Sequence, residues 1–357
     1  APTRAAFLTG RYGFRNGIGG VGGGPGSGVL SLAELTLPEA LNGYESACIG
    51  KWHLAGNQNL THPTASGFDH YAGMIGGSVQ NYFQWPLVEN GSSNISSTYT
   101  TTELTDRAIQ SVQTMQGPWF LYLSYNAPHT PFHLPPSGLC PTTGCTSPIC
   151  SGLGPNPSNR ELSKAMVEAL DVELGRFLAA LEAVDPNAFV FFMGDNGTGR
   201  QASEPPFTAA HAKGSIFEGG VNVPLIVRGP GVVRAESPAL ISVVDLFATM
   251  TELASMPMIT EDSVSFAPTF SDPTRTPRST VYSETFLPNG TTGVYTEHER
   301  CVRNDRYKLL RRLGETDEMY DLELDPFETV NLLPTLTPAQ QTAFSELEAV
   351  LVQLGVD

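Results

Sequence analysis

The sequence predicts an α/β fold with a mostly parallel central sheet, followed by a small C-terminal α+β subdomain. Apolar segments of strand length alternate with segments of helical spacing over most of the 357 residues, which is typical of a parallel sheet with helical crossovers. Beyond about residue 256 this alternation gives way to a Pro-, Ser- and Thr-rich stretch and then to closely spaced strand-like segments. We therefore divide the chain into residues 1–255, a linker or surface loop over 256–280, and the subdomain over 281–357.

The helices of the first part are predicted from capping pairs and apolar spacing. Ser158-x-x-Glu161 is a capping box, and the apolar residues that follow it keep helical spacing as far as Leu181. A similar pair, Ser31-x-x-Glu34, predicts a helix as far as Leu41, although a proline lies inside it. The other predicted helices of this part are 104–115 and 243–253, and its predicted strands are 44–49, 119–125, 189–193 and 223–227.

The predicted subdomain combines short strands with one long helix. A final amphipathic segment over 338–354 has the spacing of a helix. The strand-like segments before it are 281–285, 301–302, 307–311 and 319–322.

Composition excludes two classes of partner. The chain has 20 basic and 36 acidic residues and a formal net charge of −16, and no block of Lys and Arg offers a footprint for a phosphate backbone, so we expect no nucleic-acid partner. No apolar run approaches the roughly 18 residues that a membrane-spanning helix requires, so we expect no membrane span.

Cysteines and glycosylation triplets favour an exported protein, whether extracellular, periplasmic or lysosomal. Three of the five cysteines, Cys140, Cys145 and Cys150, lie in one loop. A structural zinc site needs four ligands, so disulfides or free thiols are favoured over a metal there. N-x-S/T triplets, which would make the protein a glycoprotein if used, occur at Asn59, Asn90, Asn94, Asn196 and Asn289.

Several polar residues follow directly after predicted strands. They are Lys51, His53, His129, Asp195 and Asn196, and ligands of parallel sheets bind at the carboxyl ends of the strands. We therefore expect these side chains to face one crevice. Asp195 and Asn196 offer the oxygen ligands that Ca²⁺ or Mg²⁺ takes, although an ordinary Asp-Asn-Gly turn or a glycosylated Asn196 would also explain the pair.

Cationic residues in this acidic chain suggest a local anion pocket. Lys51 and Lys213 would belong to this pocket, although each lysine taken alone would be interpreted as a solvated surface charge. A Gly-x-Gly-x-x-Gly match at 17–22 is instead attributed to chance, because the glycines continue past it and no apolar strand precedes it.

Five segments in the chain are distinctive in composition and order: APTRAAFLTGR at 1–11, GKWHL at 50–54, NAPHTP at 126–131, GDNG at 194–197 and KGSIFEGG at 213–220. In this order they resemble the signature blocks of the formylglycine-dependent sulfatases of the arylsulfatase type, which belong to the alkaline-phosphatase-like superfamily. Residues 301–333 are similar to the family's C-terminal subdomain. The resemblance therefore extends over nearly the whole chain.

The resemblance implies an alkaline-phosphatase-like sandwich that hydrolyses a sulfate monoester of a small molecule or a glycan. In this family a formylglycine hydrate is the nucleophile and a divalent metal assists it. By resemblance, Lys51, His129 and Lys213 contact the sulfate, and His129 or Lys213 protonates the leaving oxygen. His53 acts on the formylglycine hydroxyl as a base, and Arg4 orients the nucleophile. The metal, Ca²⁺ or alternatively Mg²⁺, would be held by Asp195 and Asn196.

The chain departs from the family pattern at two places. The Cys or Ser that a formylglycine-generating enzyme would modify, and an adjacent pair of Asp metal ligands, have no counterpart, so we expect both to precede Ala1 and the chain alone to be inactive. Asn222 stands where the family usually has Arg. The alternatives left open are a phosphonate or phosphate ester hydrolase of the same superfamily and a non-catalytic binding protein with this fold.

Overall fold

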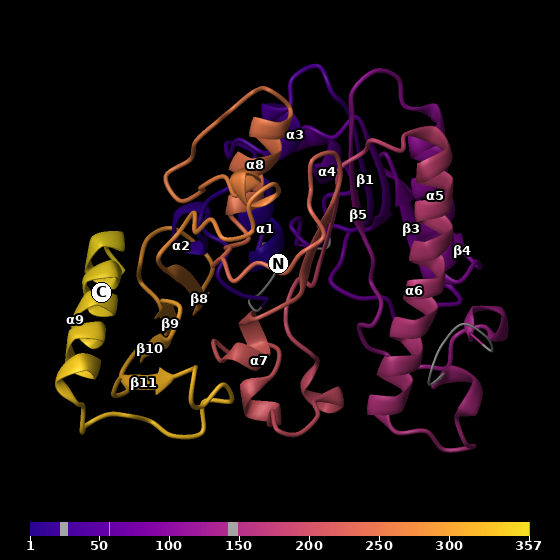
Figure 1. The fold of residues 1–357 in the computed structure, drawn as a ribbon. Coiled ribbons are helices and arrows are strands. Elements are labelled where there is room, and N and C mark those ends of the chain that lie inside the picture. The colour runs from indigo at the N-terminus through magenta and orange to yellow at the C-terminus, as the bar shows by residue number, and fades with distance from the viewer. Residues whose placement is uncertain (22–27, 57, 142–148, 357) are drawn as a thin grey trace. The chain divides into compact units, whose positions relative to one another are not determined.

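The chain forms two compact units. The computed structural model describes residues 1–357 except 22–27, 57, 142–148 and 357 (Figure 1). A terminal unit comprises Ala1–Leu30, Phe191–Arg200 and Pro205–Asp357, and a middle unit comprises Ser31–Val190 and Gln201–Glu204. The terminal unit thus joins the start of the chain to its C-terminal third. The division at residues 255 and 281 stays a prediction.

The middle unit is built on a five-stranded sheet of order β4-β3-β2-β1-β5. The central strand β1 (Glu45–Lys51) pairs in parallel with β2 (His70–Met74) on one side and β5 (Trp119–Ser124) on the other. An antiparallel hairpin of β3 (Trp85–Glu89) and β4 (Ser92–Ser96) extends the sheet beyond β2. The predicted α/β class with parallel strands at its centre is confirmed.

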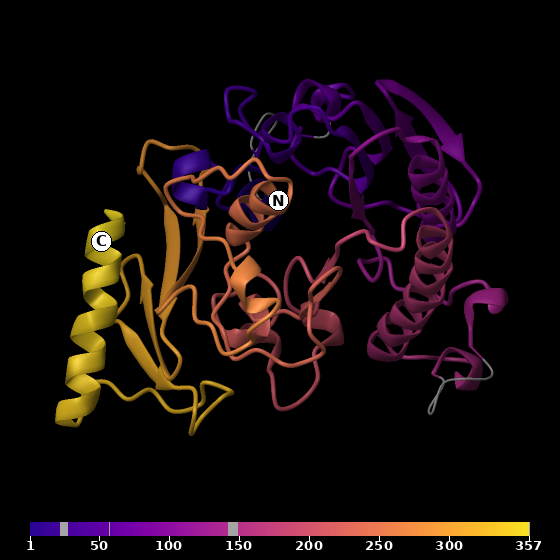
Figure 2. The same cartoon turned by 45° about the horizontal axis from the view of Figure 1, so that its top comes forward.

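Two long helices of the middle unit, α5 (Thr100–Thr114) and α6 (Asn159–Val184), lie side by side in both ribbon views (Figures 1 and 2). The predicted capping box begins α6, because the Ser158 N–H donates to Glu161 Oε2 at 2.8 Å. The helices and the sheet enclose an apolar core, whose members include Ile49, Ala72, Leu104, Val112, Met166 and Phe177.

The helix predicted from Ser31 to Leu41 is wrong in its start and length. Only α3 (Leu37–Ala40) is helical, and its capping box is formed by Thr36 and Glu39, with the Thr36 N–H donating to Glu39 Oε2 at 2.8 Å. Pro38 explains the difference, because proline fits the first turn of a helix but breaks a helix interior. One further short helix, α4, spans His62–Ala65.

The N-terminal and central segments of the terminal unit are mostly helices and turns. Its short helices are α1 (Pro2–Thr9), α2 (Gly13–Asn16), α7 (Glu218–Val221) and α8 (Asp245–Leu253). The strands β6 (Val190–Met193) and β7 (Leu225–Arg228) pair with each other. Single 3₁₀ turns in the chain are Ser137–Leu139, Cys150–Gly152, Arg200–Ala202, Ala209–His211 and Ala267–Thr269.

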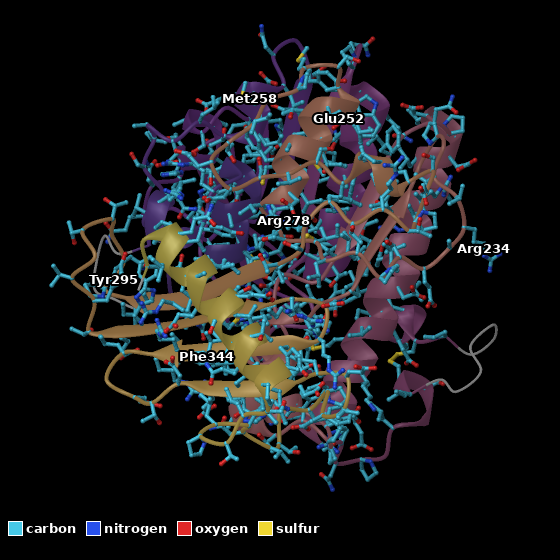
Figure 3. All side chains as sticks on the ribbon, turned by 60° about the vertical axis from the view of Figure 1, so that its left-hand side comes forward. Arg234, Glu252, Met258, Arg278, Tyr295 and Phe344 are labelled. Carbon is cyan, nitrogen blue, oxygen red and sulfur yellow. A yellow bond between two sulfur atoms is a disulfide. The ribbon has the colours of Figure 1, made fainter. Side chains whose placement is uncertain are left out.

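The last part of the terminal unit is an antiparallel sheet of order β11-β10-β9-β8 covered by one helix. Helix α9 (Pro338–Leu354) packs on the sheet through Leu347 and Leu351, which share a buried cluster with Val302 and Leu309. Figure 3 shows α9 lying across the strands, with Phe344 labelled on it. The strands are β8 (Val281–Leu287), β9 (Glu297–Arg303), β10 (Tyr307–Arg312) and β11 (Glu318–Asp321), so the predicted α+β subdomain is confirmed.

Cys140 and Cys150 form a disulfide, which agrees with the favoured interpretation of the cysteine loop. Cys145 lies outside the described residues. Cys48 and Cys301 are both buried. None of the described helices combines the length and apolar character needed to cross a membrane.

Candidate active site

In the middle unit, the strand ends bring predicted site residues to one edge of the sheet. Lys51 is the last residue of β1, and His129 follows the neighbouring strand β5. Because β1 and β5 are parallel and paired up to Gly50 and Ser124, their carboxyl ends lie at the same edge. Both residues therefore follow strands that end at this edge, while the expectation that their side chains face one crevice stays a prediction.

Lys51 is buried, with 5% of its surface exposed. Its carbonyl oxygen accepts a hydrogen bond from Ser124 Oγ at 3.0 Å, which ties the end of β1 to β5. Gly50 has a φ of +117°, and a Cβ there would lie 2.0 Å from the Ser124 carbonyl oxygen, so the close approach of the two strands requires glycine. A buried ammonium group retains its charge only near compensating partners, which suits a residue that binds an anion.

His53 adopts a left-handed backbone conformation, with φ of 61°. Its N–H donates to the carbonyl oxygen of Ile75 at 2.9 Å. A Cβ at Gly77 would lie 2.4 Å from His53 Nε2, so the ring packs directly on the Gly77 backbone. Non-glycine residues in this conformation are uncommon and concentrate at functional sites.

His129 is held on both its backbone and its ring. Nδ1 lies 2.9 Å from the Thr130 carbonyl oxygen, and because a carbonyl only accepts, Nδ1 must carry the proton of that bond. Tyr82 donates its hydroxyl to the carbonyl oxygens of His129 at 2.7 Å and Asn126 at 3.2 Å. Burial raises the pKa of Tyr82 far above its ordinary value, so the hydroxyl stays a donor. No feature of the sequence marked Tyr82 as the residue that holds this loop.

In the terminal unit, Arg4 of α1 pairs with Asp195, which follows β6. Arg4 is 5% exposed, and its Nη2 lies 3.2 Å from Asp195 Oδ2. The hydroxyl of Thr3 donates to the Asp195 carbonyl oxygen at 2.5 Å. The predicted nucleophile-orienting arginine and the predicted metal ligand are therefore direct partners.

Asp195 and Asn196 offer only oxygen ligands to a cation, since the amide nitrogen of Asn196 donates to Asp195 Oδ1 at 2.5 Å. Such ligands suit a hard cation, and two residues supply part of its coordination sphere. Among the residues that the structure describes, no group of three or more His, Cys, Asp and Glu side chains is arranged to hold a metal. The pair fits a divalent metal as a partial site.

Lys213 interacts electrostatically with the Arg4–Asp195 pair. Burial lowers the pKa of the Lys213 ammonium, Asp195 raises it, and Arg4 lowers it, so the pKa lies below its ordinary value. The Lys213 N–H donates to the Thr198 carbonyl oxygen at 2.9 Å, which joins the two loops. Arg200 Nε donates to the Lys213 carbonyl oxygen at 3.2 Å.

The predicted site residues therefore fall into two groups. Lys51, His53 and His129 belong to the middle unit, and the terminal unit carries the others, which are Arg4, Asp195, Asn196 and Lys213. Within the terminal unit the charges of Arg4, Asp195 and Lys213 interact. The expectation that both groups face one crevice stays a prediction.

Asn222, the predicted departure from the family pattern, packs on Glu218. Its Nδ2 lies 3.1 Å from Glu218 Oε2, and Nη1 of Arg303 on β9 lies 2.8 Å from the same oxygen. A guanidinium group from strand β9 therefore contacts Glu218 at the start of α7.

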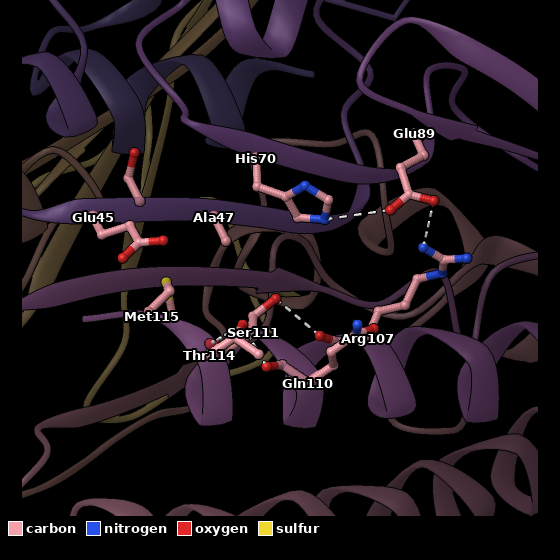
Figure 4. Close-up of a pocket in the computed structure, with 10 residues that line it drawn as sticks. Glu45, Ala47, His70, Glu89, Arg107, Gln110, Ser111, Thr114 and Met115 are labelled. Carbon is pink, nitrogen blue, oxygen red and sulfur yellow. Dashed lines mark hydrogen bonds and ion pairs between the residues drawn. The ribbon is translucent and has the colours of Figure 1, made fainter.

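A separate cavity of about 240 Å³ lies in the middle unit between α5 and the starts of β1 and β2 (Figure 4). Arg107 on α5 contacts Glu89 at 2.9 Å across it, and His70 lies 3.8 Å from the same carboxylate. None of the predicted site residues lines it, and Glu45 at the start of β1 marks it as lying at the sheet edge opposite to Lys51.

Comparison with known families gives two matches. The profile of the Sulfatase family matches residues 1–256, and that of the N-sulphoglucosamine sulphohydrolase C-terminal region matches residues 209–356. Together the two matches extend over nearly the whole chain.

Individual relatives agree with these matches. Arylsulfatase G of Rattus norvegicus is 29% identical over 88% of the chain, and N-acetylgalactosamine-6-sulfatase of Homo sapiens is 31% identical over 72% of it. The chain spans 67% and 53% of these relatives' own lengths. The crystal structure of Ps i-CgsB in complex with k-i-k-neocarrahexaose superposes with a TM-score of 0.79 at 25% identity, covering 98% of this chain and 81% of that one.

Proposed function

Because the chain belongs to the sulfatase family, we propose that the protein hydrolyses a sulfate monoester. The observation that carries the proposal is the Arg4–Asp195 ion pair at 3.2 Å, a cation held on a candidate metal ligand in a chain of formal net charge −16, with the charge of Lys213 interacting with both partners. Preorganised cations stabilise the charge that builds on sulfuryl oxygens in the transition state. The names of the relatives, which are sulfatases, favour sulfate over phosphate or phosphonate and favour catalysis over mere binding.

The proposed roles of the residues follow from their chemistry. Lys51, His129 and Lys213 bind the sulfate oxygens, and His129 or Lys213 gives a proton to the leaving oxygen. The lowered pKa of Lys213 suits a proton donor, because an ammonium group of ordinary pKa releases its proton poorly near neutral pH. His53 accepts the proton of the nucleophile's hydroxyl, and Arg4 orients the group that reacts.

Asp195 and Asn196 hold the divalent metal, with Ca²⁺ preferred and Mg²⁺ as the alternative. When bound, the metal supplies Lewis-acid polarisation of a sulfuryl oxygen. Arg4 keeps the Asp195 carboxylate oriented through its 3.2 Å contact. The nucleophile is the formylglycine of the family, produced from Cys or Ser by a formylglycine-generating enzyme.

The proposed substrate is a sulfated glycan or a sulfated small molecule, and the proposed compartment is outside the cytosol. The similar structure Ps i-CgsB is described in complex with an oligosaccharide, which supports a glycan. The Cys140–Cys150 disulfide supports an exported protein, because disulfides persist mainly in oxidising compartments.

Rates on matched esters test the function. Protein expressed from the complete gene should hydrolyse an aryl sulfate faster than the corresponding aryl phosphonate, and faster phosphonate turnover would overturn the proposal. Lys51→Ala and Lys213→Ala should each lower kcat about 10²- to 10³-fold, the usual loss for one transition-state donor. Lys164→Ala is the control, because Lys164 is half-exposed and pairs with Glu204, away from the candidate site residues. Unchanged kcat in the first two variants would reject their roles.

A further inference from the structure

Lys308 is a charged residue that the proposed function does not use, yet its side chain is fully buried. Its Nζ lies 2.9 Å from Glu218 Oε1 and 2.9 Å from Glu328 Oε1. Burying an ammonium group is costly unless opposite charges compensate it, and here two carboxylates do so. A buried ion pair often adds little to the free energy of unfolding, because apolar side chains of similar size in its place can be equally stable. The Lys308 contacts are therefore considered for their effect on the position of α7.

Glu218, the first residue of α7, is held by its side chain and by its backbone. Besides its contact with Lys308, the Glu218 carboxylate accepts a hydrogen bond from Arg303 Nη1, which lies 2.8 Å from Oε2. The Glu218 N–H donates to Glu328 Oε2 at 2.6 Å. Burial would raise the pKa of Glu218, but the positive charges of Lys308 and Arg303 hold the pKa below its ordinary value, so the carboxylate is ionised. The start of α7 is therefore fixed to β9, β10 and the Glu328 turn.

The loop with the candidate metal ligands rests on α7, and the Lys213 loop is hydrogen-bonded to that loop. The Gly197 N–H donates to the Gly220 carbonyl oxygen at 2.9 Å, and a Cβ at Gly197 would lie 1.8 Å from the Gly219 carbonyl oxygen. The Lys213 N–H in turn donates to the Thr198 carbonyl oxygen at 2.9 Å. A displacement of α7 therefore moves both loops.

We propose that the buried contacts of Lys308 with Glu218 and Glu328 position the Asp195–Asn196 turn and the Lys213 loop through α7. Lys308 is thus a positioning residue of the C-terminal sheet and does not itself touch substrate or metal. The inference rests on the proposed function only for the roles of Asp195, Asn196 and Lys213.

A charge-balanced double variant separates positioning from stability. Lys308→Met/Glu328→Gln removes one charge of each sign, while the amide oxygen at 328 can still accept the Glu218 N–H. Arg311→Met/Asp317→Asn is the matched control, because Arg311 lies on the same strand and pairs with Asp317 at 2.7 Å and with Glu348 of α9 at 3.0 Å, away from α7.

Amide hydrogen exchange reports the positioning directly. In the Lys308 double variant, the N–H groups of Gly197 and Lys213 should exchange at least about tenfold faster than in the wild type, while the antiparallel sheet keeps its protection. Ca²⁺ affinity of the protein from the complete gene should fall about 10- to 100-fold, the usual effect of losing an outer support of a metal site. The Arg311 double variant should change neither quantity.

Each outcome decides a separate claim. Unchanged exchange at Gly197 and Lys213 in the folded Lys308 double variant would overturn the inference, whatever the activity. If the double variant does not fold, Glu328→Gln alone, which keeps the Lys308–Glu218 contact, should still show faster exchange than the wild type, and its failure to do so counts against the inference. A wild-type protein that hydrolyses no sulfate ester would instead overturn the proposed function and leave the exchange result standing.

Discussion

Gly197 lies against the backbone of Gly219 so closely that a Cβ on Gly197 would come 1.8 Å from the Gly219 carbonyl oxygen. The contact holds the turn that carries Asp195 and Asn196 against α7. Because the obstructing atoms are backbone atoms, they cannot move aside as a flexible side chain would. The glycine of the Asp-Asn-Gly sequence is therefore required by packing, whatever else the turn does.

Gly197→Ala should push the metal-ligand turn away from α7. We expect a loss of about 1–3 kcal/mol in the free energy of unfolding, the usual cost of overpacking, together with weaker Ca²⁺ binding. Gly175→Ala is the control, because Gly175 lies within α6 and a Cβ there meets nothing within 4 Å. This control should gain about 0.5–1 kcal/mol in urea unfolding. Equal stability of the two variants would contradict the packing argument.

Substitution of Arg278 should strongly lower the free energy of unfolding, although Arg278 lies in the stretch predicted as a linker. Its guanidinium contacts both carboxylate oxygens of Asp245, which is fully buried and also accepts the N–H groups of Ser242 and Val264. Arg278→Met would leave that charge without its cation, so we expect a loss of about 3–5 kcal/mol in urea unfolding. Arg275→Met removes an exposed partner and should cost about 0–1 kcal/mol. Similar losses in both variants would be evidence against a buried charge at Asp245.

The sequence predicted those elements in which local signals agreed with tertiary packing. The capping box at Ser158 and the spacing after it predicted α6, and the last helix begins and ends where it was predicted, at Pro338 and Leu354. The β3–β4 hairpin was not predicted, because Ser92–Ser96 is mostly exposed and polar and carries no apolar alternation. Its strand character comes from pairing with β3, which a single segment does not reveal.

The positions of the candidate residues along the strands were predictable one by one, but the contacts between them were not. The positions of Lys51 and Asp195 after strands follow from strand spacing, whereas the Arg4–Asp195 contact joins residues far apart in the chain. The support of the His129 loop by Tyr82 is likewise a long-range contact from a tyrosine with no distinguishing neighbours. Such contacts form only in the completed fold, so a single sequence does not show that Arg4 pairs with Asp195 or that Tyr82 bonds to the His129 loop.

The thiols of Cys48 and Cys301 should resist alkylation in the native protein. Both are buried, and burial raises the pKa of the Cys301 thiol to about 11, with the charge of Lys308 opposing this rise. Only thiolates react, so iodoacetamide at neutral pH should label these positions after unfolding alone. Peptide mapping by mass spectrometry should also find Cys140 linked to Cys150 without reduction. Rapid labelling of native Cys301 would contradict its burial.

His133 should make the middle unit less stable in mild acid. Its Nδ1 donates to the Pro131 carbonyl oxygen at 2.9 Å, and its Nε2 accepts from the Tyr99 hydroxyl at 3.0 Å, so the neutral ring satisfies both partners. Burial lowers the pKa of His133, although the Pro131 carbonyl opposes this. Tyr82 and Tyr99, which pack on the ring, have raised pKa values and stay neutral throughout this range.

The sign of the His133 effect follows from proton uptake. The unfolded chain, with a histidine pKa near 6.5, binds a proton before the folded protein does, so stability is complete above about pH 6.5 and falls as the pH drops towards the lower folded pKa. His133→Gln removes this titration. The stability advantage of the wild type over the variant in urea unfolding should therefore shrink between about pH 7.5 and about pH 5.5. An advantage that is constant or grows over this interval would show that His133 is not held neutral by the fold.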